Sequence, residues 1–235
     1  MNLEIFSSSS ADEWDHFIKD SVNGTFLHSR KFLSYHKERF IDRSVFFTNK
    51  QKIIGLLPAA YHLQEKNTIC SHPGLTYGGF VHNGDLRGSN MVEAINLTME
   101  YFKKERFKKF IYKSIPSIYH KLPCQEDIYF MSNIGSLFRC DLSSCIDLSA
   151  RYEVSSRRKR SLKKALSSNI TIKDGLSEAK SIWTVLTENL DQKYKARPVH
   201  TLEEITFLGT ELSENINFKS AYLENNIIAG LVLFE

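Results

Sequence analysis

A histidine and a tyrosine that could do acid–base chemistry, His72 and Tyr77, lie in the segment CSHPGLTYGGFVHNG (residues 70–84), which also holds Gly78 and Gly79. An imidazole can accept a proton, and a phenol can donate a hydrogen bond or a proton. Glycines let a backbone approach a ligand closely, or they mark a bulge in a strand. Two interpretations stay open: the wall of a substrate cleft, or a bulged strand whose histidine and tyrosine only pack.

The glycines of this segment do not form a phosphate-binding loop. No Lys-Ser or Lys-Thr pair follows them, and their spacing differs from the dinucleotide-binding fingerprint. The segment also does not lead directly into a predicted helix, whose N-terminal amides would bind a phosphate.

A second candidate site is the segment FLHSRKF (residues 26–32), where we expect Ser29 to cap a helix. The amide groups of the first turn would then lie free beside Arg30 and Lys31, and the helix dipole favours an anion there. The alternative is that Ser29 only caps the helix and that both cations are solvated at the surface.

The third candidate is the basic segment RRKRSLKKALSS (residues 157–168). Arg157, Arg158 and Arg160 would attract the phosphates of tRNA or of a nucleotide-linked substrate, with an affinity that falls as salt rises. A thin apolar stripe that includes Leu162 predicts that this helix docks on the protein and turns its cations outward. A solvated basic linker helix is the alternative.

The sequence gives no support to hydrolase or metalloenzyme chemistry. It has no GxSxG or HExxH motif, and its histidines lack the spacing of metal ligands, so we expect no metal site. The four cysteines form no CxxC pair, which favours free thiols.

The composition is that of a globular protein. Of 235 residues, 42% are hydrophobic and 25% are charged, and the net charge of +4 does not by itself indicate a nucleic-acid or membrane partner. The N-terminus does not resemble a secretory signal, and no apolar run is long enough to span a bilayer. We therefore expect a soluble, cytoplasmic protein without a membrane span.

The elements that must position the candidate residues follow a mixed α/β order up to residue 148. In chain order they are the strand NLEIF (2–6); a helix opened by Ser10 and Glu13; a helix from Ser29 to Phe40; a hairpin around NKQK (49–52); a strand, the glycine segment and another strand over 67–81; a long helix capped by Asn90 and Glu93; and the strand KKFIYKSI (108–115). After the basic segment, we expect the strand ITIKDG (170–175), a helix around Trp183, and a helix opened by the capping box of Thr201 and Glu204.

Two hairpin sequences, VFFTNKQKIIGLLPAA (45–60) and SAYLENNIIAGLVLFE (220–235), share an apolar run, a polar turn, an Ile-Ile pair and a glycine. Each follows a strand and two helices, and aligning Ile53 with Ile227 gives an offset of 174 residues. The shared order predicts a tandem duplication.

We expect a first copy over residues 1–148, a basic linker helix over 149–169 and the N-terminal part of a second copy over 170–235. The second copy ends soon after its hairpin, whereas the first continues, so we expect the second to be truncated.

The order of the elements resembles the tandem form of the GNAT acyltransferase fold, found in the Fem-type peptidoglycan aminoacyltransferases and related GNAT N-acetyltransferases. Four segments are similar to those of this family: its "fLqSxxW" start, its glycine-bearing strand, its "RxxIKKAxxxGVxV" entry to the second repeat, and its second hairpin. Here they read NGTFLHSRKFLSYH (23–36), PGLTYGGFV (73–81), the basic run through SLKKALSSNITIKDG (161–175), and NIIAGLVLF (226–234).

The resemblance implies an α+β fold with a mixed sheet, the acyl-CoA N-acyltransferase fold, in one complete and one incomplete copy. It implies transfer of an acyl or aminoacyl group from acyl-CoA or aminoacyl-tRNA to an amine of a sugar-nucleotide or other cell-envelope precursor. No metal is needed. The alternative is a non-catalytic binding module that uses its basic helix for RNA or an acidic partner.

The resemblance also assigns residues. The implied acceptor pocket is lined by His28, Ser29, Lys31, Tyr77, Gly78 and Gly79. His72 and Tyr77 are the candidates for proton transfer, and the arginines named above, Arg30 included, are the candidates for binding anionic groups. The chain departs from the family in three ways: Phe32 replaces a tryptophan, the helical arm is missing, and the donor loop of the second repeat would lie beyond Glu235.

Overall fold

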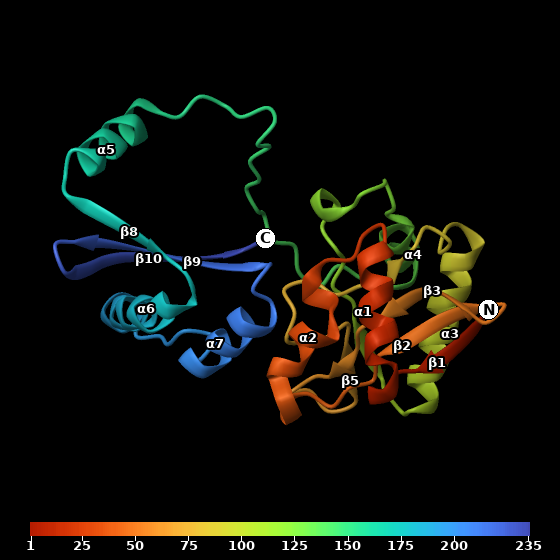
Figure 1. Cartoon of the computed structure of the whole chain (residues 1–235). Coiled ribbons are helices and arrows are strands. Elements are labelled where there is room, and N and C mark those ends of the chain that lie inside the picture. The colour runs from red at the N-terminus through yellow and green to blue at the C-terminus, as the bar shows by residue number, and fades with distance from the viewer. The chain divides into compact units, whose positions relative to one another are not determined.

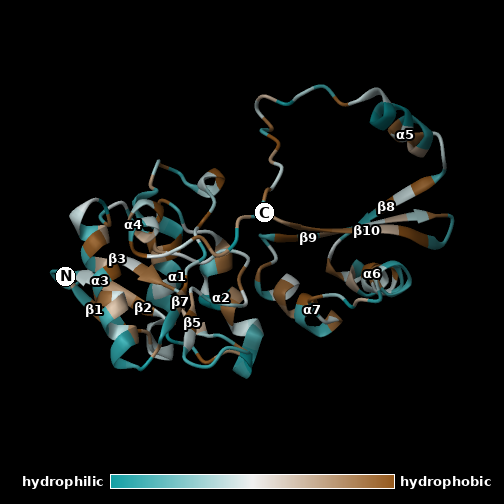
Figure 2. Ribbon diagram, turned by 180° about the vertical axis from the view of Figure 1, so that it is seen from behind, coloured by the Kyte–Doolittle hydropathy of each residue, from teal (hydrophilic) through white to brown (hydrophobic).

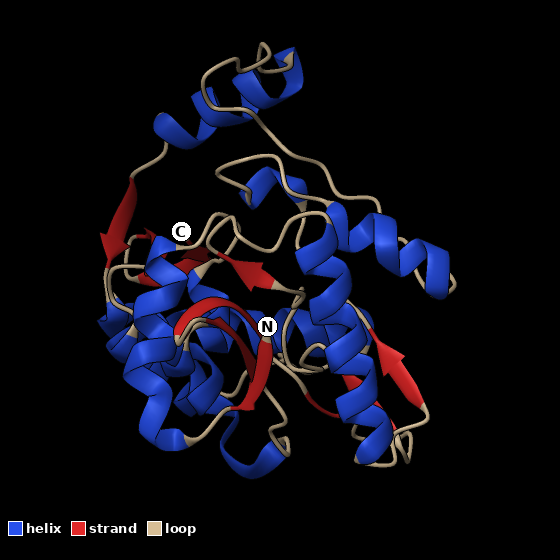
Figure 3. Cartoon of the chain, turned by 90° about the vertical axis from the view of Figure 1, so that its right-hand side faces the viewer, coloured by secondary structure: helices blue, strands red, loops and turns tan.

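The computed structural model describes residues 1–235 and divides them into two units, Met1–Phe138 (unit 1) and Arg139–Glu235 (unit 2) (Figure 1). Helices contribute more residues than strands (Figure 3). None of these helices is long and apolar enough to cross a membrane.

Unit 1 contains a four-stranded antiparallel sheet in the order β1-β2-β3-β6. Its strands are β1 (Asn2–Ile5), β2 (Val45–Asn49), β3 (Lys52–Leu57) and β6 (Val81–His82). The predicted hairpin joins β2 to β3 through Lys50 and Gln51, whose φ angles of 47° and 64° are both positive. A two-residue hairpin turn with positive φ at both positions matches the twist of the strands.

Different helices cover the two faces of this sheet. On one face, Phe46 packs with Trp14 of α1 (Ala11–Asp20). On the other face, Phe47 lies in a core that includes the apolar side chains of α3 (Ser89–Lys104). Successive residues of a strand point to opposite faces, so the apolar run of β2 supplies both cores.

A second sheet of unit 1 has the order β4-β5-β7, with β5 parallel to β7. Its strands are β4 (Ala60–Tyr61), β5 (Thr68–Cys70) and β7 (Lys109–Ile111), and the short helix α4 (Glu126–Ile134) follows them. The glycine segment leaves the second sheet after β5 and enters the first sheet at β6. The predicted strand, turn and strand therefore belong to two different sheets.

Unit 2 has one antiparallel sheet in the order β10-β9-β8. Its strands are β8 (Ile170–Asp174), β9 (Ile216–Leu223) and β10 (Asn226–Phe234), and its helices are α5 (Ser156–Leu166), α6 (Ala179–Tyr194) and α7 (Leu202–Glu211). Ile182 of α6 and Leu208 of α7 are buried with Phe218 of β9. The apolar faces predicted for α6 and α7 therefore form the core of this unit.

The helix α5 buries none of its side chains, and its hydropathy is mainly hydrophilic (Figure 2). Leu162 is 59% exposed and Leu166 is 77% exposed. The prediction that this apolar stripe docks on the protein is wrong for unit 2. Two leucines bury little area, and the many cations around them are most stable in water.

Two predicted helix caps are present. The Ser29 hydroxyl accepts a hydrogen bond from the Phe32 amide at 3.1 Å, and Thr201 and Glu204 form the expected reciprocal capping box. The helix after Ser29 is shorter than predicted, because α2 (Arg30–Leu33) gives way to a 3₁₀ segment in which Lys37 has a φ of 50°.

Two other predicted caps are wrong. Ser10 precedes α1 but caps no amide, because the chain enters this helix through a 3₁₀ turn. α3 begins after Gly88 rather than Asn90, and the carboxylate of Glu93 binds the terminal amino group of Met1 at 3.0 Å instead. Glu93 therefore pairs with a charged group that is distant in sequence and does not cap its own helix.

Candidate functional site

The glycine segment is held by contacts between backbone groups of unit 1. The Gly78 amide donates to the Lys113 carbonyl at 3.1 Å, and the Lys113 amide donates to the Ser71 hydroxyl at 2.7 Å. A Cβ at position 78 would lie 1.9 Å from the Ser71 carbonyl oxygen. Gly79 has a φ of +82°, a conformation that glycine adopts easily. Close approach of backbone segments therefore accounts for both glycines without a ligand.

The imidazole of His28 is fully buried beneath this segment. Its Nδ1 accepts the Thr25 amide at 3.0 Å, so its Nε2 carries the proton and donates to the Gly78 carbonyl at 3.1 Å. Burial lowers the pKa of His28 to about 4, although its backbone hydrogen bonds oppose the shift. His28 is therefore neutral near pH 7 and fixes the position of Gly78.

Tyr77 is the candidate whose hydroxyl is best placed to act on a substrate. Its oxygen lies 3.1 Å from the Thr25 hydroxyl, and its ring stacks on Tyr119 with centroids 5.0 Å apart. Tyr119 is 45% exposed and Tyr77 is 7% exposed, so Tyr119 is the member of the stacked pair that lies at the surface. Burial raises the pKa of Tyr77 to about 12, so the phenol keeps its proton and can donate it in a hydrogen bond.

His72 lies elsewhere in the segment, with its ring 5.2 Å from the rings of both His36 and Phe40. Burial first, and then the nearby His36 and Arg30, lower the pKa of His72 to about 2. An imidazole with so low a pKa is a weak base for an ammonium group. Neither candidate therefore has a pKa near 7, and Tyr77 is the one that keeps a hydroxyl proton to donate in a hydrogen bond.

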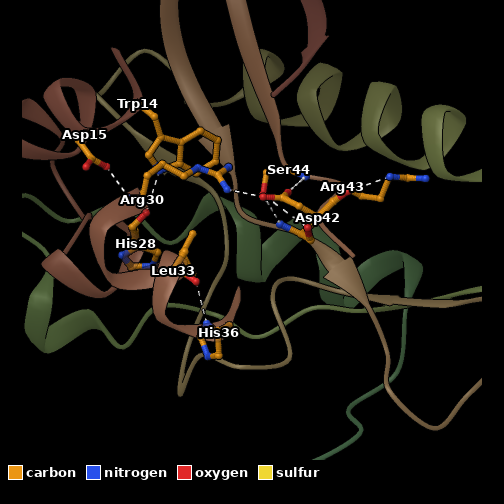
Figure 4. A network of polar contacts seen from close by, with 10 residues as sticks. Trp14, Asp15, His28, Arg30, Leu33, His36, Asp42, Arg43 and Ser44 are labelled. Carbon is orange, nitrogen blue, oxygen red and sulfur yellow. Dashed lines mark hydrogen bonds and ion pairs between the residues drawn. The ribbon is translucent and has the colours of Figure 1, made fainter. Parts of the chain in front are cut away.

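The N-terminus of α2 already holds an anion, the carboxylate of Asp15 (Figure 4). The Arg30 amide donates to one of its oxygens, and the Lys31 amide donates to the other at 3.4 Å. The Arg30 guanidinium lies over the Trp14 ring at 3.8 Å and pairs with Asp42. An external anion at this helix end would have to displace Asp15.

The remaining predicted residues are dispersed. Ser29 is buried as a helix cap, and the Lys31 side chain is exposed. Arg157, Arg158 and Arg160 are exposed on α5 in unit 2. The structure thus brings together His28, Tyr77, Gly78 and Gly79 in unit 1.

Several residues of this region had no signal in the sequence. Thr25 and Tyr119 contact Tyr77; the sequence gave Thr25 no role although it lies in the family-like segment 23–36, and Tyr119 lies in a segment without a motif. The Tyr112 hydroxyl accepts the Phe80 amide at 3.0 Å and donates to Asp127. Burial raises the pKa values of Tyr112 and Asp127. A Cβ at Gly79 would lie 3.0 Å from the Tyr112 hydroxyl, so this pair lies close to the glycine segment.

The fold has a counterpart among solved structures. The crystal structure of FemX matches with a TM-score of 0.57 and 13% sequence identity, over 95% of this chain and 58% of FemX. This chain therefore spans less than two thirds of the length of FemX. An aminoglycoside antibiotic 6'-N-acetyltransferase, AAC(6')-IG from Acinetobacter haemolyticus, matches over 63% of this chain and 100% of its own length, with 14% identity. Its TM-score of 0.38 is too low to indicate a shared fold. No protein-family model and no curated protein matches the sequence.

The likeness to FemX confirms the coarse prediction from sequence. As predicted, the chain has a mixed α/β fold, and that fold is similar to the fold of FemX.

Proposed function

We propose that this chain acts in acyl transfer to an amine. The donor would be acyl-CoA or aminoacyl-tRNA, and the acceptor a small molecule such as a sugar-nucleotide or another cell-envelope precursor, in the cytoplasm. The supporting observation is the likeness of fold to FemX over 95% of the chain. Donor, acceptor and location all belong to the proposal, because fold alone does not define a substrate.

The proposed acceptor surface is formed by Thr25, Tyr77 and Tyr119, with His28 and Gly78 beneath them. In acyl transfer the amine nitrogen attacks the carbonyl carbon of the donor, and the bond to the CoA sulfur or the tRNA ribose oxygen breaks. The nitrogen loses a proton, and the leaving group gains one. Tyr77 is protonated near neutral pH, so its hydroxyl can donate a hydrogen bond to the departing sulfur or oxygen, and the proton that the nitrogen loses can reach the leaving group through water.

We also propose that residues 1–148 and 170–235 are copies of one ancestral unit, as predicted from the sequence, with residues 149–169 as a basic linker between them. In unit 1, Ile53 pairs with Thr48, and Gly55 pairs with Phe47, which leaves Ile54 as an extra residue. In unit 2, the residues 174 positions further on pair in the same way, and the pairing shifts at the corresponding residue, 228. Shared register and a shared irregularity support common descent better than strand order alone.

The test is a transfer assay on the full chain with a panel of acyl-CoAs, aminoacyl-tRNA and amine acceptors that includes amino sugar nucleotides. The readout is release of free CoA or deacylated tRNA that depends on the acceptor. We expect Tyr77→Phe to lower kcat at least tenfold, because the substitution removes the hydroxyl group and keeps the ring. Tyr129→Phe, at an exposed tyrosine of α4 outside the proposed acceptor surface, is the matched control and should retain activity. Equal activity of Tyr77→Phe and wild type would remove Tyr77 from the reaction.

A non-catalytic binding module is the second candidate function. The observation that favours it is the exposed row of cations on α5, where the ion pair formed is Lys159 with Glu153 at 3.8 Å. Filter binding of tRNA at two salt concentrations measures this property. If the module is correct, affinity should fall steeply with salt, and replacing Arg157, Arg158 and Arg160 by alanine should flatten the slope. Binding that ignores salt would contradict this function.

A further inference from the structure

A hollow of about 410 Å³ lies in unit 1 where the last turns of α3 meet β7, away from the residues of the proposed acceptor surface. Its volume is within the range of small-molecule pockets. It is lined by Met99, Glu100, Phe102, Lys103, Phe107, Lys108, Lys109 and Phe110. Apolar and charged side chains therefore share the lining.

The floor of this α3-end pocket is aromatic and firmly packed. The ring of Phe102 contacts those of Phe107 and Phe110, with centroids 5.9 and 5.1 Å apart and nearly perpendicular planes. Phe102 and Phe107 are buried, whereas Met99 is 41% exposed beside them. Direct apolar contact to a ligand therefore comes mainly from Phe110, which is partly exposed, and from the flexible Met99, with Phe102 and Phe107 packed beneath them.

The rim of the α3-end pocket is basic. Lys109 already pairs with Glu65 at 2.8 Å. Lys103 and Lys108 are exposed and form no ion pair, and Glu100 supplies the single carboxylate of the lining. Three lysines against one glutamate leave the lining with a positive charge, so the rim attracts an anion.

We infer that the α3-end pocket binds a small amphipathic anion. The apolar part of the ligand, an alkyl chain or a flat ring, would lie on the aromatic floor, and its carboxylate or phosphate would lie near Lys103 and Lys108. A neutral apolar ligand would gain nothing from these ammonium groups. The phosphates of a nucleic acid would contact the lysines of the rim but not the recessed aromatic floor. The inference rests on this pocket alone and is independent of the proposed acyl transfer.

The four methionines of the chain allow a direct test. In the full chain labelled with ¹³C at the methionine methyl groups, decyl phosphate is titrated below its micellar concentration, and decanol is the neutral control. We expect a saturable shift of the Met99 resonance. Met91, which is on the same helix but buried in the core, should not move.

The double variant Lys103→Glu/Lys108→Glu should weaken decyl phosphate binding about tenfold, because two attractions become repulsions near the surface. Raising the salt concentration should weaken wild-type binding as well. Lys19→Glu, at an exposed lysine of α1, is the matched control and should bind as wild type. A parallel titration with decanoate distinguishes a carboxylate ligand from a phosphate.

Three results would overturn the inference. In the first, decanol moves Met99 at the same concentration as decyl phosphate, which would mean that the lysines take no part. In the second, all four methionine resonances move together, which would indicate general detergent action. In the third, Met99 does not respond to either anion. Lys103→Gln/Lys108→Gln is a milder second variant for the case in which charge reversal disturbs folding.

Discussion

In unit 1, Trp14 of α1 donates its indole N–H to the carbonyl of His28 at 2.8 Å, and in unit 2, Trp183 of α6 donates to the carbonyl of His200 at 2.9 Å. Each acceptor immediately precedes the residue that caps the next helix, Ser29 in unit 1 and Thr201 in unit 2. The same long-range hydrogen bond thus fixes the start of the second helix in both units.

The two units complete this helix start differently. In unit 1, Asp15 of α1 supplies the carboxylate at the N-terminus of α2, and Trp14 is fully buried. In unit 2, Glu204 of α7 itself closes the cap, and the Trp183 side chain is half-buried. Tertiary packing does in unit 1 what a local capping box does in unit 2. The stability of unit 1 should therefore depend more strongly on its buried side chains than the stability of unit 2 does.

Acidification should give the largest difference in stability between the two units, because seven of the eight histidines lie in unit 1. Burial lowers the pKa values of His28 and His82 to about 4 and that of His72 to about 2. Unfolded chains take up these protons below about pH 6.5, whereas the folded unit does not, so stability rises with pH. From pH 7 to pH 5 we expect a loss of about 2 kcal/mol for each of the three.

Urea denaturation monitored by tryptophan fluorescence measures this loss. Each unit contains one tryptophan, so Trp183→Phe reports unit 1 and Trp14→Phe reports unit 2. A pH-independent midpoint for unit 1 would show that its histidines are not buried as neutral groups.

Replacing each tryptophan by alanine, in separate variants, should give the next largest difference in stability loss between the two units. Trp14→Ala should destabilise unit 1 by about 3–5 kcal/mol, the usual range for a fully buried large aromatic residue. Trp183→Ala should cost about 1–2 kcal/mol, because its side chain is already partly solvated. Chemical denaturation followed by far-ultraviolet circular dichroism measures both. Equal losses would mean that the two indoles are equivalent in energy as well as in geometry.

Glycine substitutions should give a smaller difference in the same direction. Gly78→Ala places a Cβ against a backbone oxygen of Ser71, which cannot rotate away, so we expect a loss of about 2–3 kcal/mol. Gly230→Ala places a Cβ 2.8 Å from the γ-carbons of the buried, β-branched Ile182, which can move only with its helix, so we expect about 1–2 kcal/mol. Thermal unfolding of both variants tests the order, and the reverse order would contradict it.

Mutations of single cap residues should give the smallest difference in stability loss between the two units. Ser29→Ala and Thr201→Ala each remove one side-chain acceptor, for about 1 kcal/mol. Asp15→Ala should add a further loss in unit 1, because two amides of α2 lose their acceptor. Glu204→Gln keeps the capping box of unit 2 and serves as the control. If Asp15→Ala proved neutral, the contrast between tertiary and local capping would fail.

The sequence by itself determined the features that depend on local pattern. The polar turn between two β-rich runs predicted both hairpins, and the Thr201–Glu204 spacing predicted a cap that forms within one turn. The offset between Ile53 and Ile227 identified residues that occupy equivalent register positions. Each of these depends on residues within one element or one hairpin, where the period of the side chains fixes the faces.

Only the tertiary structure decided which chemistry each candidate residue can do. The segment FLHSRKF (26–32) left open a free anion site at the start of a helix, but the carboxylate of Asp15 occupies it from another helix. His72 and Tyr77 looked equivalent in sequence, but burial leaves one a weak base and the other a protonated phenol. Proton affinity and free hydrogen-bond donors depend on desolvation and on distant partners, which the order of residues along a chain does not specify.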